Sequence, residues 1–324
     1  MAQLIKLEDY ISRYEWDPYK YPSRFIRLKR EQWDQLHAQR ERDIESATVM
    51  QEETISQAEQ EESFFKKWFR RKKDNLEAEN PEPETERIFG RNLARLSETE
   101  LKHFFLDHLF PIQLKWATST VTEVSFVKRS YERDRRLKYF LQRFPDTFLI
   151  MYYPIFNIRK APIECEIIMI TPLGIEIIAS IEKKPGVRII AGDERKWTLE
   201  DGERSEMILN PAISLKRTEH VVRSILSAEG VEFPIRKTIL AEKNQIIYTT
   251  EPYQIDIIDE LRYPEWFEEK RKLNTPLKSL QLKSVAALLG QTRTNAVKRP
   301  EWEEDKPYMN APDDRDITVK AEQS

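Results

Sequence analysis

The fold is decided by residues 148–192, which read FLIMYYPIFNIRKAPIECEIIMITPLGIEIIASIEKKPGVRIIAG. The stretch consists of short apolar runs rich in Ile, separated by Pro and Gly, and such runs are typical of buried β-strands. Thr171–Gly174 (TPLG) is a four-residue turn between two of these runs. It predicts an antiparallel hairpin in which Ile170 lies opposite Ile175. This hairpin is the expected centre of a β-sheet.

Helical patterns lie on both sides of this strand-rich stretch. Ser97 and Glu100 form a capping-box signature, so a helix is expected to begin there. Residues 130–144 (SYERDRRLKYFLQRF) predict a charged amphipathic helix, and residues 207–230 predict a longer one. One or two further strands and closing helices follow. The order predicts an α/β (α+β) fold with a mixed central sheet flanked by helices.

Four regions are expected along the chain. Residues 1–40 carry apolar residues at helical spacing and predict an N-terminal helical module. Residues 41–92 are Glu/Gln-rich or acidic with prolines and predict a charged linker, in part helical and in part disordered. Residues 93–295 form the main domain. Residues 296–324 are polar and contain proline, which predicts a disordered tail.

Composition excludes several classes of protein. The net charge of −3 excludes a generally basic nucleic-acid coat, so any nucleic-acid contact must use a local patch. The single cysteine, Cys165, excludes an internal disulfide framework and a multi-Cys metal site. No Gly-rich phosphate loop is present, and no secretory signal or long apolar run is found. A cytoplasmic protein is therefore expected.

The segment FFKKWFRRKK, residues 64–73, interrupts the acidic linker. On a helix its aromatic residues would share one face and its basic residues would fill the rest, which is how a short interfacial membrane anchor is built. The aromatic residues are Phe64, Phe65, Trp68 and Phe69. The segment could contact a membrane weakly at the inner face, bind a partner or nucleic acid, or dock on the protein's own core.

Several short motifs follow one another between residues 130 and 295. Glu164-Cys165-Glu166 stands before an apolar strand, and the Thr171–Gly174 turn and a second strand come after it. Trp197, Asn210–Pro211 at a helix start, and the closing helix LKSLQLKSVAALL complete the set. In these motifs the segment resembles the nuclease-related domain (NERD) family, a bacterial branch of the PD-(D/E)xK nuclease superfamily. The resemblance covers about half of the chain and implies a restriction-endonuclease-like fold.

The resemblance also implies metal-assisted phosphodiester hydrolysis, in which carboxylates hold Mg²⁺ and a lysine orients water or stabilises charge. The implied catalytic residues are Glu166, Glu182 and Lys184. The implied metal ligands are Glu166, Asp134 and Glu182. Mg²⁺ is the expected cofactor if the site is active.

Hairpin geometry bears on whether this site is intact. With Thr171–Gly174 as the turn, Glu166 lies opposite Ala179, and Glu182 falls three positions away, roughly 10 Å along the strand, on the other face. Two hypotheses follow. In one, the nuclease site is degenerate; in the other, the strand register shifts and Glu182 with Lys184 rebuilds an active site.

Basic residues could contact phosphates beside such a site: Arg135, Arg136, Lys216 and Arg217. The alternative is an ordinary solvated helix face. The leading functional hypothesis is a catalytically impaired nuclease-related protein that binds nucleic acid or another protein. The alternatives are an active Mg²⁺-dependent nuclease and a peripheral membrane scaffold that uses residues 64–73.

Overall fold

The computed structural model describes residues 1–64, 93–158, 161–192, 195–202 and 204–299. In chain order, its first elements are β1 (Gln3–Leu7), α1 (Arg13–Trp16), α2 (Tyr21–Phe64), α3 (Glu98–Trp116), β2 (Glu123–Val124), a 3-10 turn (Arg129–Arg133), α4 (Arg135–Gln142), β3 (Leu149–Tyr152), β4 (Ile155–Ile158), β5 (Ala161–Glu164), β6 (Ile167–Thr171) and β7 (Gly174–Ser180). The later elements are β8 (Arg188–Ile190), β9 (Lys196–Asp201), β10 (Arg204–Leu209), α5 (Pro211–Ala228), β11 (Ile235–Leu240), β12 (Ile246–Ile247), β13 (Asp256–Ile258), α6 (Tyr263–Lys272), α7 (Ser279–Leu289) and β14 (Val297–Lys298).

The core of the protein is a mixed six-stranded sheet in the order β1-β3-β6-β7-β11-β13. Its central hairpin, β6–β7, has the predicted register, with Ile170 opposite Ile175. The Thr171 hydroxyl oxygen accepts hydrogen bonds from the backbone N–H groups of Leu173 and Gly174, which closes the turn. A Cβ on Gly174 would lie 2.9 Å from the carbonyl oxygen of Pro234, so this position has no room for a side chain.

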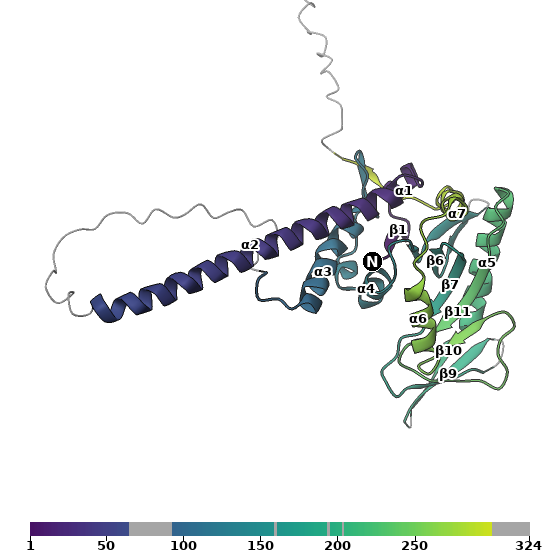
Figure 1. Ribbon diagram of the computed structural model, residues 1–324. Coiled ribbons are helices and arrows are strands. Elements are labelled where there is room, and N and C mark those ends of the chain that lie inside the picture. The colour runs from purple at the N-terminus through teal and green to yellow at the C-terminus, as the bar shows by residue number, and fades with distance from the viewer. Residues whose placement is uncertain (65–92, 159–160, 193–194, 203, 300–324) are drawn as a thin grey trace, which may run out of the picture.

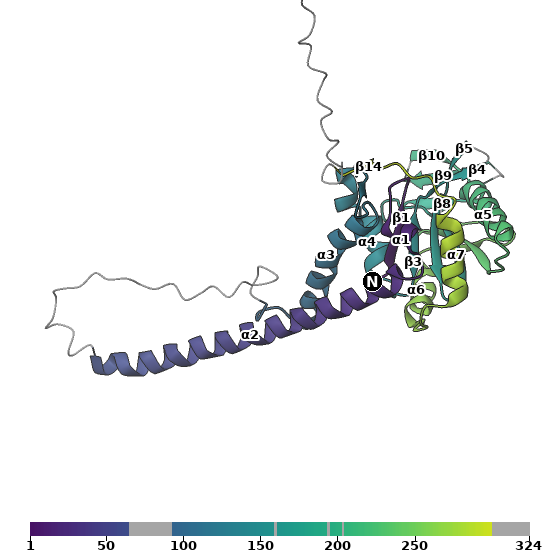
Figure 2. The same cartoon turned by 90° about the horizontal axis from the view of Figure 1, so that it is seen from above.

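Helices cover both faces of this sheet, as the expected α/β class requires. One core cluster joins a sheet face to α5 and α7, and contains Ile177, Leu215 and Leu288. The other joins the opposite face to α3, α4 and α6, and contains Phe140 and Trp266. Seen from above, β1 and β3 lie between α3 and α4 on one side and α7 on the other (Figure 2). The mixed sheet flanked by helices is confirmed.

Two helix predictions in this domain are confirmed in detail. Ser97 caps α3 and forms a reciprocal capping box with Glu100. The amphipathic segment around residue 138 is α4, and its inward residues are Leu137, Phe140 and Leu141, all buried. Local capping and apolar spacing were sufficient here because both signals act within one or two turns of the chain.

The N-terminal residues differ from the expected helical module. Residues 3–7 form β1, an edge strand that pairs in parallel with β3, and all five are buried. A buried apolar run of five residues is compatible with a strand or a helix. Here the run forms a strand because it pairs with β3. The helix prediction for these residues was therefore wrong. The first part of the following α2 packs on the body, where Phe25 and Leu36 are fully buried, and its later part extends away from the rest of the protein (Figure 1).

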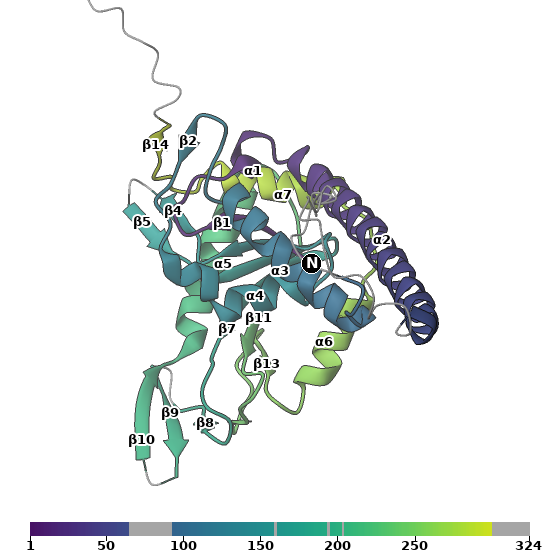
Figure 3. The ribbon, with the colours of Figure 1, turned by 90° about the vertical axis from the view of Figure 1, so that its left-hand side faces the viewer.

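A second sheet continues from the central one in the order β10-β9-β8-β12. Figure 3 shows β8, β9 and β10 beyond the ends of β7 and β11. Trp197 on β9 is 1% exposed and joins the core that contains α5, which anchors this sheet to the body. Cys165 and Glu166 separate β5 from β6, so the first strand of the central hairpin begins at Ile167.

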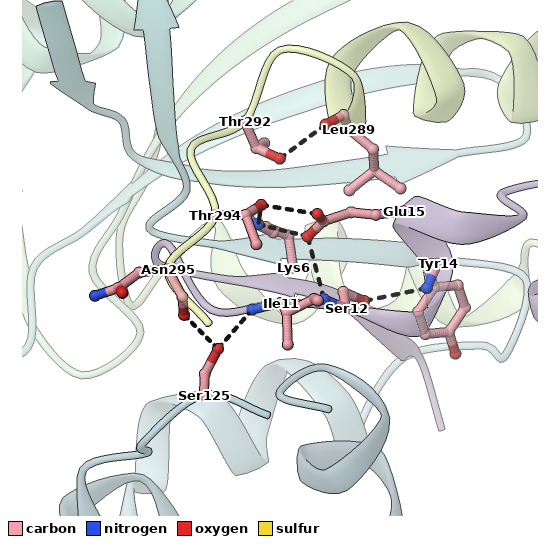
Figure 4. Close-up of polar contacts among 10 residues, drawn as sticks. All are labelled: Lys6, Ile11, Ser12, Tyr14, Glu15, Ser125, Leu289, Thr292, Thr294 and Asn295. Carbon is pink, nitrogen blue, oxygen red and sulfur yellow. Dashed lines mark hydrogen bonds and ion pairs between the residues drawn. The ribbon is translucent and has the colours of Figure 1, made fainter. Parts of the chain in front are cut away.

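The segment after α7 is fastened to the N-terminal residues (Figure 4). Lys6, fully buried on β1, forms an ion pair with Glu15 at 2.5 Å and donates a hydrogen bond to the Thr294 hydroxyl at 3.1 Å. The Ser125 hydroxyl donates to the carbonyl oxygen of Asn295 at 2.6 Å. Val297–Lys298 then form β14, which pairs with β2, so these two residues are ordered against the body instead of lying in the expected disordered tail.

Candidate functional site

The candidate site lies at one edge of the central sheet. Strands β1, β3, β7, β11 and β13 run in the same direction, whereas β6 runs against them. The carboxyl ends of the five strands and the start of β6 therefore share an edge. Open α/β sheets bind ligands outside the carboxyl ends of their strands. This edge is where the fold itself places a binding site.

Two positions at this edge have strained backbone conformations. Glu8, directly after β1, and Tyr153, directly after β3, have φ angles of 44° and 48°. Residues other than glycine in this left-handed region cost about 1–3 kcal/mol and cluster at functional sites. The two lie side by side, because the Glu8 backbone N–H donates to the carbonyl oxygen of Tyr152 at 3.0 Å.

A cavity of about 400 Å³ opens at this edge, between the end of β7 and the start of α5. We call it the Glu166 cavity. Its polar and charged lining residues are Arg136, Glu166, Ser180, Glu182, Lys183, Asn210 and Ser214. Ala179, Ile181, Ile208, Leu209 and Pro211 supply its apolar lining. The cavity thus combines carboxyl, guanidinium and hydroxyl groups on an apolar frame, as ligand sites commonly do.

Arg136, in the first turn of α4, reaches into the cavity and is held by its neighbours. One guanidinium nitrogen donates to the Tyr153 hydroxyl at 2.8 Å, and the other lies 3.5 Å from the Glu182 carboxylate. The Nε atom of Arg136 is buried without a hydrogen-bond acceptor in the described structure. Each terminal nitrogen of Arg136 carries a second N–H, so the guanidinium can still donate to an anion such as phosphate at the cavity wall.

Glu166 precedes β6 and is half-buried. Its backbone N–H donates to the Thr218 hydroxyl at 3.0 Å, which ties it to α5. Burial raises the pKa of the Glu166 carboxyl, and this outweighs the opposing effects of hydrogen bonding with Ser214 and of the charges of Arg217 and Arg136. A carboxyl group with a raised pKa in a cleft is suited to proton transfer near neutral pH.

The first turn of α5 forms the opposite wall. Asn210 caps the helix by accepting a hydrogen bond from the backbone N–H of Ala212, and Pro211 occupies the first helical position. The N-terminus of an 18-residue helix carries partial positive charge from its unpaired N–H groups, which attracts anions. The sequence pair Asn210–Pro211 had indicated this helix start, and the structure shows that it faces the cavity.

The structure does not gather the predicted metal ligands. Asp134 caps α4 through the backbone N–H of Leu137 and accepts a hydrogen bond from the Tyr152 hydroxyl, so its carboxylate is already engaged. Glu182 pairs with Arg136. Within the described ranges, no group of three His, Cys, Asp or Glu side chains is placed to hold a metal ion. These residues do not fit the predicted Mg²⁺ site, and a Mg²⁺ requirement stays a prediction.

The three predicted catalytic residues are only partly brought together. Glu166 and Glu182 line the same cavity, but Glu182 and Lys184 lie beyond the last paired residue of β7. Lys184 is exposed, and its carbonyl oxygen accepts a hydrogen bond from the Asn244 side chain. The observed register, with Ile167 opposite Ile178, is the one that separates Glu166 from Glu182 along the strand. No shifted register rebuilds the expected carboxylate–lysine pair.

Of the basic residues predicted to contact nucleic acid, only one lines the Glu166 cavity. Arg136 lines the cavity, whereas Arg217 is not among its lining residues, although its charge lowers the pKa of the Glu166 carboxyl. Arg135 lines a neighbouring pocket, and Lys216 is exposed on α5. Of the aromatic segment 64–73, Phe64 is the last residue of α2, and Phe65, Trp68 and Phe69 lie outside the described residues. The binding roles of these basic residues and of the aromatic residues stay predictions.

Sequence reasoning missed Tyr153, Asn210 and Ser214 as members of this site. Tyr153 lies inside an apolar strand-like run, and nothing in the run distinguishes it from its buried neighbour Tyr152. Asn210 and Ser214 belong to a helix start that was recognised, but only the fold shows that this start faces Glu166. The cavity forms only because the fold brings Glu166 next to the start of α5, more than forty residues later in the chain.

In the part of the chain that the structure describes, no helix combines the length and apolarity needed to cross a membrane. The chain matches no family model. It also matches no solved structure. A segment of 116 residues is 41% identical to a protein of Geobacillus stearothermophilus described as an RNA 2',3'-cyclic phosphodiesterase.

The matched segment spans 35% of this chain and 36% of that relative, so the similarity covers only about a third of either protein. It overturns the assignment to the nuclease-related domain family, which was wrong. That assignment rested on short motifs, each of which is weakly specific on its own. The functional hypotheses are corrected as well: the impaired nuclease-related binding protein and the Mg²⁺-dependent nuclease, which followed from that resemblance, and the membrane scaffold, which was inferred from residues 64–73.

Proposed function

We propose that this protein is a phosphoesterase that hydrolyses 2',3'-cyclic phosphate at the end of RNA. The observation that carries the proposal is the Glu166 cavity, where a half-buried carboxyl group, the Arg136 guanidinium and the N-terminus of α5 surround one space. The similarity to an RNA 2',3'-cyclic phosphodiesterase supports the choice of substrate, because a cyclic phosphate is an anion of a size that this space accommodates.

In the proposed reaction, Arg136 and the backbone N–H groups at the start of α5 hold the non-bridging phosphate oxygens. They also stabilise the charge that develops on these oxygens in the transition state. Ser214, whose hydroxyl lies in the first turn of α5, lines the same wall. The ribose would extend toward the apolar residues Ile208 and Leu209.

Glu166 supplies the proton transfer. A water molecule attacks the phosphorus atom, the bond to one ribose oxygen breaks, and that oxygen takes up the proton of the Glu166 carboxyl group. The attacking water releases its proton to solvent, and Glu166 is reprotonated from solvent. General acid catalysis of this kind contributes about 10²–10⁴-fold in rate. The product is a ribose that carries one phosphomonoester and one free hydroxyl.

The test is an assay of the full chain on a short oligoribonucleotide that ends in a 2',3'-cyclic phosphate. The products are separated by chromatography and treated with a phosphomonoesterase. The expected result is conversion to a terminal monoester that the phosphomonoesterase removes. Parallel assays with EDTA and with added Mg²⁺ address the metal requirement. An RNA end that remains cyclic under all of these conditions would refute the proposed function.

A further inference from the structure

A second pocket adjoins the Glu166 cavity on the other side of the end of β7. It has a volume of about 200 Å³ and is lined by residues of α4 and of the turn after β11, including Arg135, Tyr139, Lys243 and Asn244. We call it the Asn244 pocket. It shares Arg136, Ser180, Ile181 and Glu182 with the Glu166 cavity. The two hollows are therefore neighbours across the Arg136–Glu182 pair.

The frame of the Asn244 pocket is held by one side chain. The amide nitrogen of Asn244, which is 1% exposed, donates to the carbonyl oxygens of Lys184 and Val187 at 2.8 and 2.9 Å. Its amide oxygen accepts from the backbone N–H of Lys183 at 3.3 Å. Asn244 thus joins the turn after β11 to the loop after β7. Hydrogen bonds therefore hold these two segments together where they line the pocket.

The charges that remain available in this pocket are mainly positive. Arg135 and Lys243 are exposed, and neither forms an ion pair with another described residue. Glu182 is engaged with Arg136, which leaves Glu242 as the one acidic side chain of the lining without such a partner in the described part. Two available cations against one carboxylate favour an anionic ligand.

The aromatic residue of the pocket is not available for stacking. The Tyr139 ring stacks on Phe267 and contacts Phe144 edge to face. Its hydroxyl forms a hydrogen bond with the Tyr263 hydroxyl at 3.0 Å. Base-stacking sites need an aromatic face that is free for the base. Recognition in this pocket therefore acts through charge on a phosphate and not through the identity of a base.

We propose that the Asn244 pocket binds the phosphodiester that precedes the terminal nucleotide of an RNA strand. This inference rests on the proposed function, because it assumes that the cyclic phosphate occupies the Glu166 cavity. An RNA strand that ends there has its next phosphate one nucleotide away, and the adjoining pocket offers Arg135 and Lys243 to it. The protein then prefers oligoribonucleotide ends over free 2',3'-cyclic mononucleotides, with little dependence on base sequence.

The experiment measures kcat/KM for 2',3'-cyclic UMP and for a uridine tetranucleotide that ends in a 2',3'-cyclic phosphate. The full-length wild-type protein is compared with the double variant Arg135→Ala/Lys243→Ala. The matched control is Lys283→Ala/Lys298→Ala, which removes the same charge from exposed residues outside both pockets. Thermal unfolding of all three proteins verifies that they are folded.

The wild-type protein is expected to prefer the tetranucleotide by about tenfold or more, since two exposed charge contacts together contribute roughly that factor. The ratio of the two kcat/KM values should fall toward one in the Arg135→Ala/Lys243→Ala variant and stay unchanged in the control. Raising the salt concentration should lower the wild-type ratio. Replacing the penultimate uridine by adenosine should leave it nearly the same.

The outcomes separate the two proposals. If both substrates are hydrolysed equally well, or if the Arg135→Ala/Lys243→Ala variant keeps the wild-type ratio, the assignment of the Asn244 pocket is refuted and the proposed function stands. If neither substrate is hydrolysed by the wild-type protein, the proposed function itself is refuted, and the assignment of the pocket with it.

Discussion

Two glutamates of the same hairpin, Glu166 and Glu176, have opposite surroundings. Glu176, on β7, is 3% exposed; Thr238 and Trp266 donate hydrogen bonds to it at 2.7 and 2.9 Å, and Lys270 forms an ion pair with it at 2.6 Å. Glu166 lies half-buried at the start of β6 and faces a cavity. A carboxylate with all its partners inside the protein stabilises the fold, whereas one that faces a cavity remains available to a ligand.

The largest effect is expected from Glu166→Gln. This change keeps the shape of the side chain but removes its proton-transfer ability, so the rate of cyclic phosphate hydrolysis should fall by about 10²–10⁴-fold. The melting temperature should change little, because the Glu166 side chain is not part of a closed network. The measurement is kcat on the oligoribonucleotide. Glu164→Gln, two residues earlier and exposed on β5, is the control and should keep wild-type activity. Equal activity of the two variants would contradict the assignment.

Glu176→Gln should have the opposite profile. It leaves the Lys270 ammonium, only 11% exposed, without its counter-charge, and breaking a buried ion pair costs roughly 3–5 kcal/mol. Urea unfolding should show that loss in the free energy of unfolding, while kcat per folded molecule stays at the wild-type value. The double variant Glu176→Gln/Lys270→Met should recover part of the stability. A drop in kcat with unchanged stability would show that Glu176 belongs to the functional site.

A third carboxylate, Glu219 on α5, extends the comparison to the pH dependence of stability. Burial tends to raise the pKa of Glu219, but its bonds to Lys237 and Arg223 lower it below its ordinary value. A lowered pKa in the folded state means that the ion pairs stabilise the fold above the unfolded-state pKa, 4.5. That contribution is lost as the pH falls through the folded-state value.

Glu219→Gln should therefore cost about 1–3 kcal/mol at pH 7, where the buried Lys237 loses its charged partner. The variant should also unfold with a weaker pH dependence below pH 4.5 than the wild-type protein. The measurement is the free energy of unfolding between pH 3 and 7. Parallel curves for the two proteins would mean that this pair does not contribute to acid sensitivity.

The smallest effect is expected from Arg136→Lys. Lysine keeps the positive charge but cannot present two parallel donors to a phosphate while it also binds Tyr153. Loss of one charged hydrogen bond of about 1.5 kcal/mol corresponds to a drop of about tenfold in kcat/KM. The steady-state kinetics of cyclic phosphate hydrolysis measure it. A lysine variant with wild-type kcat/KM would show that the guanidinium shape is not used.

Features encoded within a few residues were predictable from the sequence. The Thr171–Gly174 turn gave the hairpin register, and Ser97 with Glu100 gave the start of α3, because each signal acts over one turn or one strand pair. The strand at residues 3–7 was not predictable. Its identity depends on pairing with β3, and a short buried run carries no periodicity that separates strand from helix.

The candidate site was predictable only in part. Glu166 was identified, but through a family resemblance that proved wrong and with metal-binding partners that the structure does not bring to it. Its actual neighbours, Arg136 and Ser214, come from α4 and α5 and meet it only through the sheet topology. Arg136 had been selected for its charge alone. The chemistry of a site at a sheet edge depends on which helices end there, and that information is not local.

The pairing of β1 with β3 has a consequence for how this protein is made. Gln3 pairs with Leu149, so the first strand leaves the ribosome long before its partner exists. At about 5–20 residues per second, the wait for residues 149–152 lasts roughly seven to thirty seconds. During that time the apolar side chains of Leu4, Ile5 and Leu7 have no sheet to join. A nascent chain with this topology is expected to need protection by a chaperone at that stage.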